Sequence, residues 1–113
     1  MHIMKVDEKY YNLLKSGQKT IELRLFDEKR SLINIGDEIE FSNSVNNSDN
    51  FKTKVVALHK ANSFDELCNI IDITKASFET KEELLKVLEQ FYPIEKQHQY
   101  GVVGIEIFKT LAK

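Results

Sequence analysis

The sequence predicts a small α+β domain built on a curled, mostly antiparallel sheet. Segments of alternating hydrophobicity lie toward both ends of the chain, segments with helical spacing and capping signals lie between them, and no internal repeat is present. The chain has 113 residues, of which 42% are hydrophobic and 30% are charged. Because this length supports one hydrophobic core rather than two, we expect a single domain over residues 1–113.

The first elements are a strand and a short helix. His2–Val6 alternates weakly and predicts a strand. Asp7 is suited to cap the helix that follows, and Gly17 stands where a left-handed residue would end it. Tyr10 and Tyr11 fall on the hydrophobic helical face, so we assign both to helix packing.

Residues 19–26 change to a period of two and predict the second strand. Thr20, Glu22 and Arg24 share one face of this strand, and the hydrophobic residues between them share the other. Charges on the outer face of a half-buried strand normally meet solvent, so spacing alone favours an exposed polar face.

The middle of the chain predicts loops and two further strands. We expect a charged loop over residues 27–31, a tight turn over 33–37 and a strand over 38–41. Residues 42–50 contain four asparagines and three serines, which indicate a hairpin loop. A longer strand is expected over residues 51–59.

Two capping-box patterns then predict helices. Ser63 precedes a helix that should run to Ile71, and Thr80 precedes a second helix. The second should end at Tyr92-Pro93, because proline disfavours helical geometry in the residue before it. Residues 101–108 predict the last strand.

Charge limits how this chain could bind nucleic acid. Sixteen Lys and Arg residues against eighteen Asp and Glu residues give a net charge of −2. This balance excludes a polycation that coats nucleic acid through bulk charge. Residues 1–25 nevertheless carry five basic residues against three acidic ones. Any contact with an anion or with RNA is therefore expected from a local arrangement of charges.

Membrane and metal-binding classes are also disfavoured. The chain has no run of about twenty hydrophobic residues and no apolar signal-peptide core, so we expect a cytoplasmic protein with no membrane partner. One cysteine and three scattered histidines give no spacing typical of a metal site, so no metal or cofactor is expected. Cys68 is interpreted as a small buried residue of the middle helix.

Residues 17–24 concentrate charge after the glycine that ends the first helix. Glu22 and Arg24 are two apart on a strand and can pair on one face, and Lys19 lies at the corner before it. A guanidinium fork beside a carboxylate suits an anionic or planar, hydrogen-bonding ligand.

The spacing Gly17-x-Lys19-x-x-Glu22-x-Arg24 resembles the signature of the ASCH domain family, which is similar to the PUA domain of RNA-modifying proteins. Residues 35–41 resemble that family's glycine–aspartate turn into a barrel strand. Residues 91–93 and 100–105 resemble its closing segment and final strand. The resemblance implies a small PUA-like β-barrel, mostly antiparallel, with flanking helices and a charged cleft that binds RNA or nucleotides.

The resemblance makes Lys19, Glu22 and Arg24 the candidate ligand-binding residues. Thr20 shares the face of Glu22 and is a candidate polar liner, with a surface position as the alternative. Tyr100 is a candidate for stacking on a base, with packing at the barrel edge as the alternative.

A branch of the family that this chain resembles hydrolyses acetylated cytidine with a motif lysine, a threonine three residues later and a distant glutamate. Lys19 matches the lysine, but Glu22 occupies the threonine position and no distant acid can be assigned. If the chain is an enzyme, we expect a nucleoside amidohydrolase with Lys19 and Glu22 as catalytic residues.

Binding without turnover is nevertheless the first expectation. A carboxylate at Glu22 favours the ammonium form of Lys19 over the neutral amine that attacks a carbonyl, whereas the charge of Arg24 acts in the opposite direction. A Lys19–Glu22 ion pair therefore suits binding better than amine attack, unless Glu22 is engaged by Arg24. The expected partner is RNA, a nucleotide or a modified nucleoside. A protein-interaction module without a ligand is a third alternative, and it would leave the charged face in bulk water.

Overall fold

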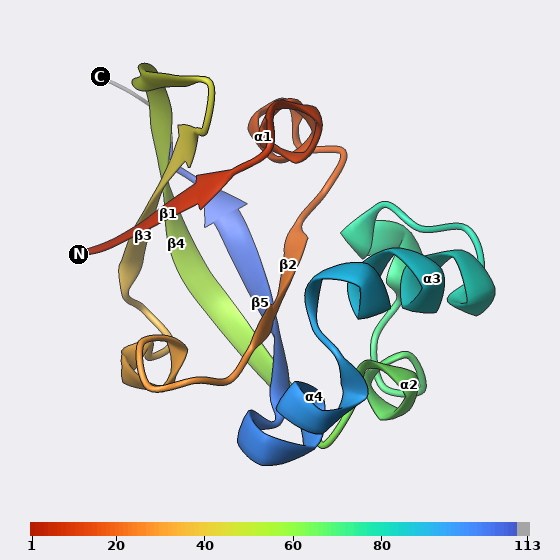
Figure 1. Ribbon diagram of the computed structural model, residues 1–113. Coiled ribbons are helices and arrows are strands. Elements are labelled where there is room, and N and C mark those ends of the chain that lie inside the picture. The colour runs from red at the N-terminus through yellow and green to blue at the C-terminus, as the bar shows by residue number, and fades with distance from the viewer. Residues whose placement is uncertain (111–113) are drawn as a thin grey trace.

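The computed structural model describes residues 1–110, which form one sheet with helices around it (Figure 1). The strands are β1 (His2–Val6), β2 (Ile21–Leu25), β3 (Glu38–Asn43), β4 (Asn46–Ala61) and β5 (Val102–Lys109). The α-helices are α1 (Glu8–Ser16), α2 (Phe64–Leu67), α3 (Lys81–Phe91) and α4 (Ile94–Tyr100). Two short 3₁₀ helices are η1 (Arg30–Leu32) and η2 (Ile73–Ala76).

The five strands form a half-barrel. Their order is β1-β3-β4-β5-β2, with β1 parallel to β3 and all other neighbours antiparallel, which confirms the predicted α+β class with a mostly antiparallel sheet. The long strand β4 pairs with β3 near its start and with β5 toward its end, and a register shift between Val55 and Ala57 bends it. The two edge strands, β1 and β2, do not pair with each other.

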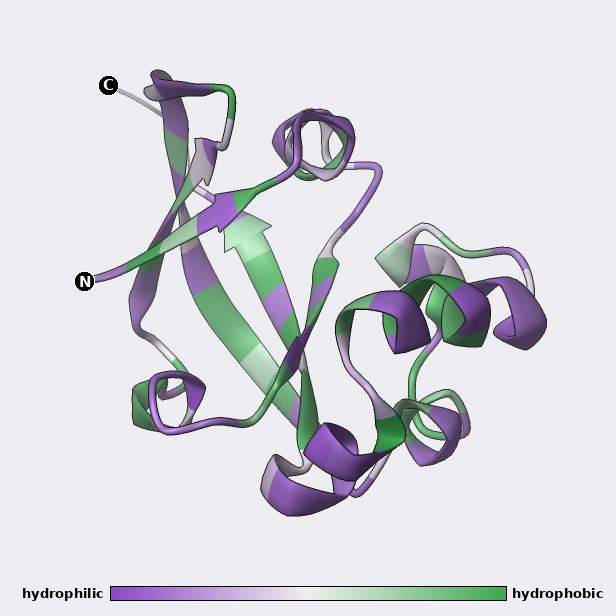
Figure 2. Cartoon of the chain, viewed as in Figure 1, coloured by the Kyte–Doolittle hydropathy of each residue, from purple (hydrophilic) through white to green (hydrophobic). Residues whose placement is uncertain are grey.

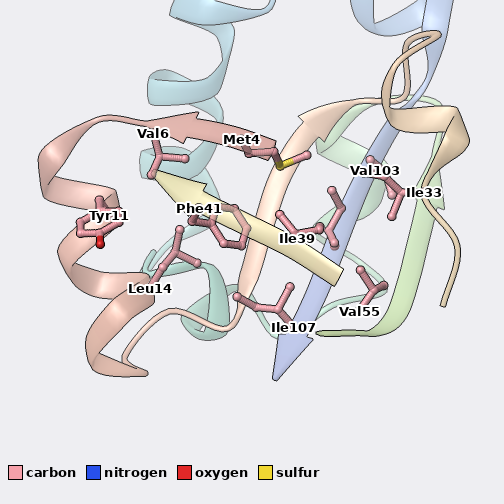
Figure 3. Packing of buried hydrophobic residues seen from close by; sticks show 11 residues of the cluster. Met4, Val6, Tyr11, Leu14, Ile33, Ile39, Phe41, Val55, Val103 and Ile107 are labelled. Carbon is pink, nitrogen blue, oxygen red and sulfur yellow. The ribbon is translucent and has the colours of Figure 1, made fainter. Parts of the chain in front are cut away.

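Two hydrophobic clusters fill opposite sides of the sheet near β5. The first lies inside the curl and joins the sheet to α1 (Figure 3). The second lies between β2, β5 and the segment from α2 to α3. Figure 2 shows green hydrophobic residues and purple hydrophilic residues along the strands and helices. Because Ile21 and Leu23 belong to the second cluster, the residues between and after them face the other way, toward α1 and β1.

The helix signals at Gly17 and Thr80 are confirmed. Gly17 ends α1 with a φ of 86°, the left-handed region that glycine adopts without strain. The Thr80 side chain accepts a hydrogen bond from the Glu83 amide and begins α3. Asp7 occupies the N-cap position of α1, but its side chain makes no capping bond.

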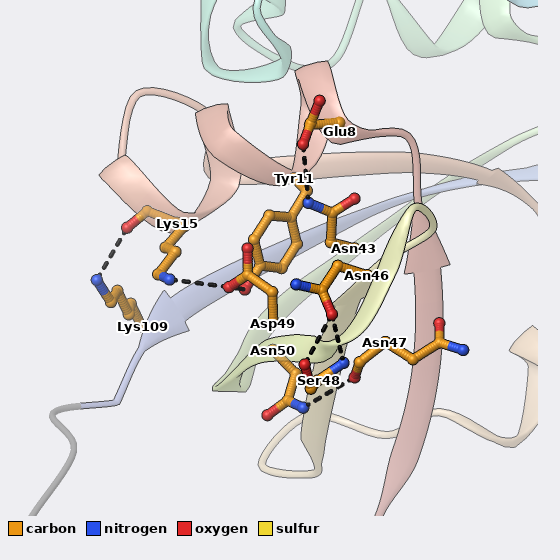
Figure 4. Close-up of polar contacts among 10 residues, drawn as sticks. All are labelled: Glu8, Tyr11, Lys15, Asn43, Asn46, Asn47, Ser48, Asp49, Asn50 and Lys109. Atoms are coloured by element: carbon orange, nitrogen blue, oxygen red, sulfur yellow. Dashed lines mark hydrogen bonds and ion pairs between the residues drawn. The ribbon is translucent and has the colours of Figure 1, made fainter.

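The predicted hairpin loop over residues 42–50 is wrong. β3 continues to Asn43 and β4 begins at Asn46, so only a tight turn separates the strands. Polar side chains are compatible with ladder pairing at the exposed end of a hairpin, where they bond to one another and to the main chain. The Tyr11 hydroxyl also donates to Asp49 at 2.7 Å and ties the hairpin to α1 (Figure 4).

The region after β4 also differs from the prediction. α2 ends at Leu67 rather than Ile71, and α4 was not predicted because Pro93 indicated only an end to α3. Pro93 serves both helices, since it stops α3 and stands at the N-cap position of α4. The buried Gln97 side chain fixes α4 by accepting from the Phe64 amide and donating to the Tyr92 carbonyl. Among residues 1–110, no helix is both long enough and apolar enough to cross a membrane.

Candidate functional site

The charged motif begins where α1 turns into β2. Gly17 reverses the chain, and the Lys19 amide donates to the Leu13 carbonyl at 3.0 Å, which holds the corner against the helix. β2 then runs from Ile21 to Leu25, so Glu22 and Arg24 project from the same side of the strand. The local sequence therefore places the three charged side chains together.

These three side chains form one connected network. Lys19 Nζ lies 3.3 Å from Glu22 Oε1, and Arg24 Nε donates to Glu22 Oε2 at 2.7 Å. A terminal nitrogen of the Arg24 guanidinium also donates to the main-chain carbonyl of Lys5 at 3.1 Å. Arg24 thus connects the two edge strands of the half-barrel, β2 and β1, across the open seam between them.

The network is buried, which corrects the expectation of a solvent-exposed polar face. Lys19 and Glu22 are each only 5% exposed. The face of β2 that carries them is covered by α1 and β1 because the sheet curls, a feature that period-two spacing does not reveal. Burial opposes ionisation of Glu22, but the Lys19 and Arg24 charges and hydrogen bonds outweigh it and lower the pKa of the carboxyl. Burial likewise opposes the charge of Arg24, and the Glu22 carboxylate outweighs it and raises the pKa of the guanidinium.

Tyr10 belongs to this site, which corrects its assignment to helix packing. Its ring centroid lies 4.8 Å from Lys19 Nζ, within the range of a cation–π contact. Burial, followed by the nearby Asp7 and Glu22 carboxylates, raises the pKa of the Tyr10 hydroxyl. Tyr11, in contrast, is fully buried in the first hydrophobic cluster, as predicted.

A pocket of about 170 Å³ opens beside the network. Its polar wall comes from β1, the start of α1 and β2, and its apolar wall comes from α3 and from residues on either side of that helix. The residues that line it are Lys5, Val6, Asp7, Tyr10, Lys19, Glu22, Leu23, Arg24, Phe78, Val87, Leu88, Phe91 and Tyr92. Figure 1 shows β2 between β5 on one side and α3 on the other. A charged wall facing an aromatic and aliphatic wall suits a flat ligand with polar edges.

Two of the predicted site residues do not line this pocket. Thr20 lies before β2 with its main chain bonded on both sides, to the Lys75 carbonyl and to the Ile107 amide. Tyr100 ends α4, where Lys96 Nζ approaches its ring, and it lies outside the pocket wall. The extra helix α4 explains this, because Tyr100 is its last residue and lies before β5 begins at Val102.

The apolar wall was not identified from the sequence. Phe78 and Tyr92 lie more than fifty residues from the charged motif, and the spacing in α3 indicated only ordinary packing. Within residues 1–110, no three His, Cys, Asp or Glu side chains gather as metal ligands. Cys68 is half-buried beside the second cluster, and burial raises the pKa of its thiol.

Comparison with known proteins places this architecture in a family. The ASCH domain profile matches residues 4–110. The crystal structure of hypothetical protein PH0355 has a TM-score of 0.83 at 38% identity, over 96% of this chain and 97% of that one. The solution structure of protein PF0455 from Pyrococcus furiosus has a TM-score of 0.76 at 34% identity, over 98% of each chain.

A more distant likeness concerns the fold alone. The crystal structure of ASCH from Zymomonas mobilis has a TM-score of 0.67 at 10% identity, over 94% of this chain and 65% of that one. The search of curated proteins found no match. The half-barrel is therefore a PUA-like fold, and the profile match over residues 4–110 shows that this chain belongs to the ASCH domain family.

Proposed function

We propose that the pocket binds the base of an RNA nucleotide or of a free nucleotide. The observation that carries this proposal is the convergence of Lys19, Glu22 and Arg24 with Tyr10 on one pocket, opposite an aromatic and aliphatic wall. A buried charged network is costly to maintain, so its position beside an open pocket points to a ligand rather than to stability.

The size and composition of the pocket favour a single base. About 170 Å³ lies below the range of roughly 300–1,000 Å³ that accommodates drug-sized ligands, and a cavity of about 150 Å³ is known to hold benzene. Such a pocket takes one ring and leaves the sugar and phosphate outside. Lys19 and Arg24 supply donors and Glu22 supplies an acceptor for the polar edge of the ring.

An exposed aromatic residue marks the mouth of the pocket. Phe91 lines the pocket and is 57% exposed, beside the ring of Tyr92. A base, or the nucleotide next to it, can stack on such a ring. Lys5 and Asp7 lie on the pocket wall contributed by β1 and the start of α1.

The binding proposal is tested with fluorescence anisotropy on short single-stranded RNA and competition by nucleoside monophosphates. Lys19→Met and Arg24→Gln keep much of each side chain's volume and remove its charge. Each should weaken binding about tenfold or more, the effect of losing one charge-assisted hydrogen bond. Lys15→Met is the matched control, because Lys15 lies on α1 but pairs with Asp49 outside the pocket. Equal affinity for wild type and both site variants would contradict the proposal.

Hydrolysis of acetylated cytidine or a related modified nucleoside is a second candidate. It is favoured by one observation, a buried lysine nitrogen 3.3 Å from a carboxylate, which is the reach of a nucleophile and its acid–base partner. Arg24 holds the same carboxylate at 2.7 Å and shares its charge with Lys19, a contact that favours turnover. The Tyr10 ring, 4.8 Å from Lys19 Nζ, suits a cation instead and favours binding. Acetate released from N4-acetylcytidine by wild type and lost in Lys19→Met would establish turnover. Release that is absent, or equal in both proteins, excludes it.

A protein-interaction module without a ligand accounts less well for the site. That role would leave the charged side chains in bulk water, whereas Lys19 and Glu22 are buried beside a pocket. Binding of a small nucleotide in the assay above, with loss in the Lys19 variant, distinguishes the two roles.

A further inference from the structure

The main chain of β2 is open along one edge. Within residues 1–110, β2 ends the sheet order and pairs with β5 alone, so the edge that faces β1 has no strand partner among them. The Lys5 carbonyl on β1 accepts from Arg24 across this gap. Two strand edges therefore face each other across the seam, with one side chain connecting them.

The register shows which main-chain groups of β2 point into the seam. Just outside the strand, the Phe26 amide donates to the Gly101 carbonyl and the Ile107 amide donates to the Thr20 carbonyl, each at 2.9 Å. These opposed pairs are hydrogen-bonded, and hydrogen-bonded pairs alternate along an antiparallel ladder. The N–H and C=O of Leu23 therefore point away from β5, into the seam.

The pocket lies at this open edge. Glu22 and Arg24 project from one face of β2, and the Leu23 side chain packs on the other face, in the second hydrophobic cluster. The pocket touches all three residues. A cavity that reaches both faces of one strand lies beyond the edge of that strand, and the other edge is occupied by β5.

The main-chain groups of Leu23 also lack another partner in the part of the chain that is described. Leu23 is only 5% exposed, and beyond the sheet ladder no main-chain or side-chain hydrogen bond involves it. Buried main-chain donors and acceptors are nearly always paired. The pocket is where such a partner would lie.

We infer that the main chain of Leu23 reads the edge of the bound base, its N–H donating to a ring acceptor and its C=O accepting from a neighbouring N–H. This inference rests on the proposed function and adds the edge of the base that is recognised. An extended residue presents its donor and acceptor side by side, the pattern that strand addition uses. The ligand class is a base with an adjacent acceptor and N–H, which in a pyrimidine means the N3 edge: N3 and N4–H of cytidine, or O4 and N3–H of uridine.

Nucleotide analogues test the recognition of this edge on the unmodified protein. Cytidine and uridine 5′-monophosphates are compared by calorimetry with 3-deazacytidine and N3-methyluridine 5′-monophosphates, which lose the N3 acceptor and the N3–H donor respectively. Each analogue should bind about three- to tenfold more weakly than its parent, the loss expected for one hydrogen bond. Equal affinity of parent and analogue would overturn the inference.

An amide-to-ester exchange tests the residue itself. Replacing Leu23 by its α-hydroxy acid keeps the side chain and removes only the N–H. Cytidine monophosphate should then bind about three- to tenfold more weakly, while 3-deazacytidine monophosphate should be unaffected, because its partner acceptor is already absent. The matched control is the same exchange at Ile21, whose N–H points to the same edge but which does not line the pocket.

The outcomes separate the two proposals. If neither parent nucleotide binds wild type, the proposed function and this inference both fall. If a parent binds and Lys19→Met weakens it, but the Leu23 ester and the Ile21 ester bind alike, only the role of the Leu23 main chain is overturned. If the ester protein does not fold, the analogue series still tests whether the base is bound through its N3 edge.

Discussion

Glu22 is the central residue of the site because its two carboxylate oxygens have different cationic partners. One oxygen faces Lys19 and the other accepts from Arg24, while the side chain is almost fully buried. Removing the carboxylate charge would leave two cations close together in a poorly solvated place. The pairing of Glu22 with Arg24 follows from their spacing on a strand, whereas the burial does not.

Glu22→Gln should therefore lower the free energy of unfolding by about 3 kcal/mol at neutral pH, the cost of breaking a buried ion pair. The folded state holds the pKa of Glu22 below its ordinary value of 4.5, so the unfolded chain takes up the proton first as pH falls. The stabilising contribution is thus present above pH 4.5 and is lost as pH falls through the folded pKa. Urea denaturation of both proteins across this pH range measures the difference.

Glu106→Gln is the control for that experiment. Glu106 contacts His59 at 2.9 Å and Lys75 at 3.9 Å but is partly exposed. Glu106→Gln should therefore lower the free energy of unfolding much less than Glu22→Gln does. If Glu22→Gln lowers the free energy of unfolding no more than Glu106→Gln does, or if its effect does not decrease at acidic pH, the network contributes little to folding.

The ends of the helices determine which residues form the walls of the pocket. α3 supplies much of the apolar wall, and its first turn is capped by the Thr80 side chain, as the capping-box pattern predicts. Asp7 occupies the N-cap position of α1, but its side chain makes no capping bond and lies on the pocket wall instead. A residue suited to cap a helix therefore caps α3 through its side chain but does not cap α1.

Thr80→Ala should lower the free energy of unfolding by about 1 kcal/mol, the usual cost of losing a side-chain cap. Asp7→Ala should cost only a few tenths of a kcal/mol, since no capping bond is lost and only an anion near the helix N-terminus is removed. Thermal or urea unfolding of the two variants compares them directly. A larger loss for Asp7→Ala than for Thr80→Ala would contradict this account of the two helices.

If the pocket binds RNA as proposed, the net charge of −2 and the small size of the pocket limit how it does so. The basic excess of the chain lies in residues 1–25, which include Lys5, Lys19 and Arg24 of the pocket wall. Lys19 and Arg24 pair with Glu22, so of these three cations Lys5 is left to neutralise a phosphate. Binding should depend on the base more than on the phosphate backbone.

The affinity for single-stranded RNA should therefore fall only gently with salt. A slope of log K against log salt of about −1 to −2 corresponds to one to three neutralised phosphates. Anisotropy titrations between about 50 and 200 mM salt measure it. A slope steeper than about −4 would indicate an extended basic surface and contradict binding through one small pocket.

Local patterns predict those elements whose signals lie within a few residues. The strand over His2–Val6, the helix ended by Gly17 and the helix begun by Thr80 all depend on such signals, and all three are found. The asparagine-rich segment over residues 42–50 was mistaken for a loop, because its pairing depends on β3 and on Asp49 meeting Tyr11. α4 was missed because its anchor, Gln97, bonds to a helix thirty-three residues earlier.

The fold class, the ASCH family and the presence of Lys19, Glu22 and Arg24 on one short segment follow from sequence patterns alone. The burial of this segment, the pocket completed by Tyr10 and the α3 side chains, and the open edge of β2 depend on the three-dimensional fold. The physical reason is the curl of the sheet. Alternation along a strand distinguishes its two faces, but which face is covered, and by what, depends on where distant strands and helices meet.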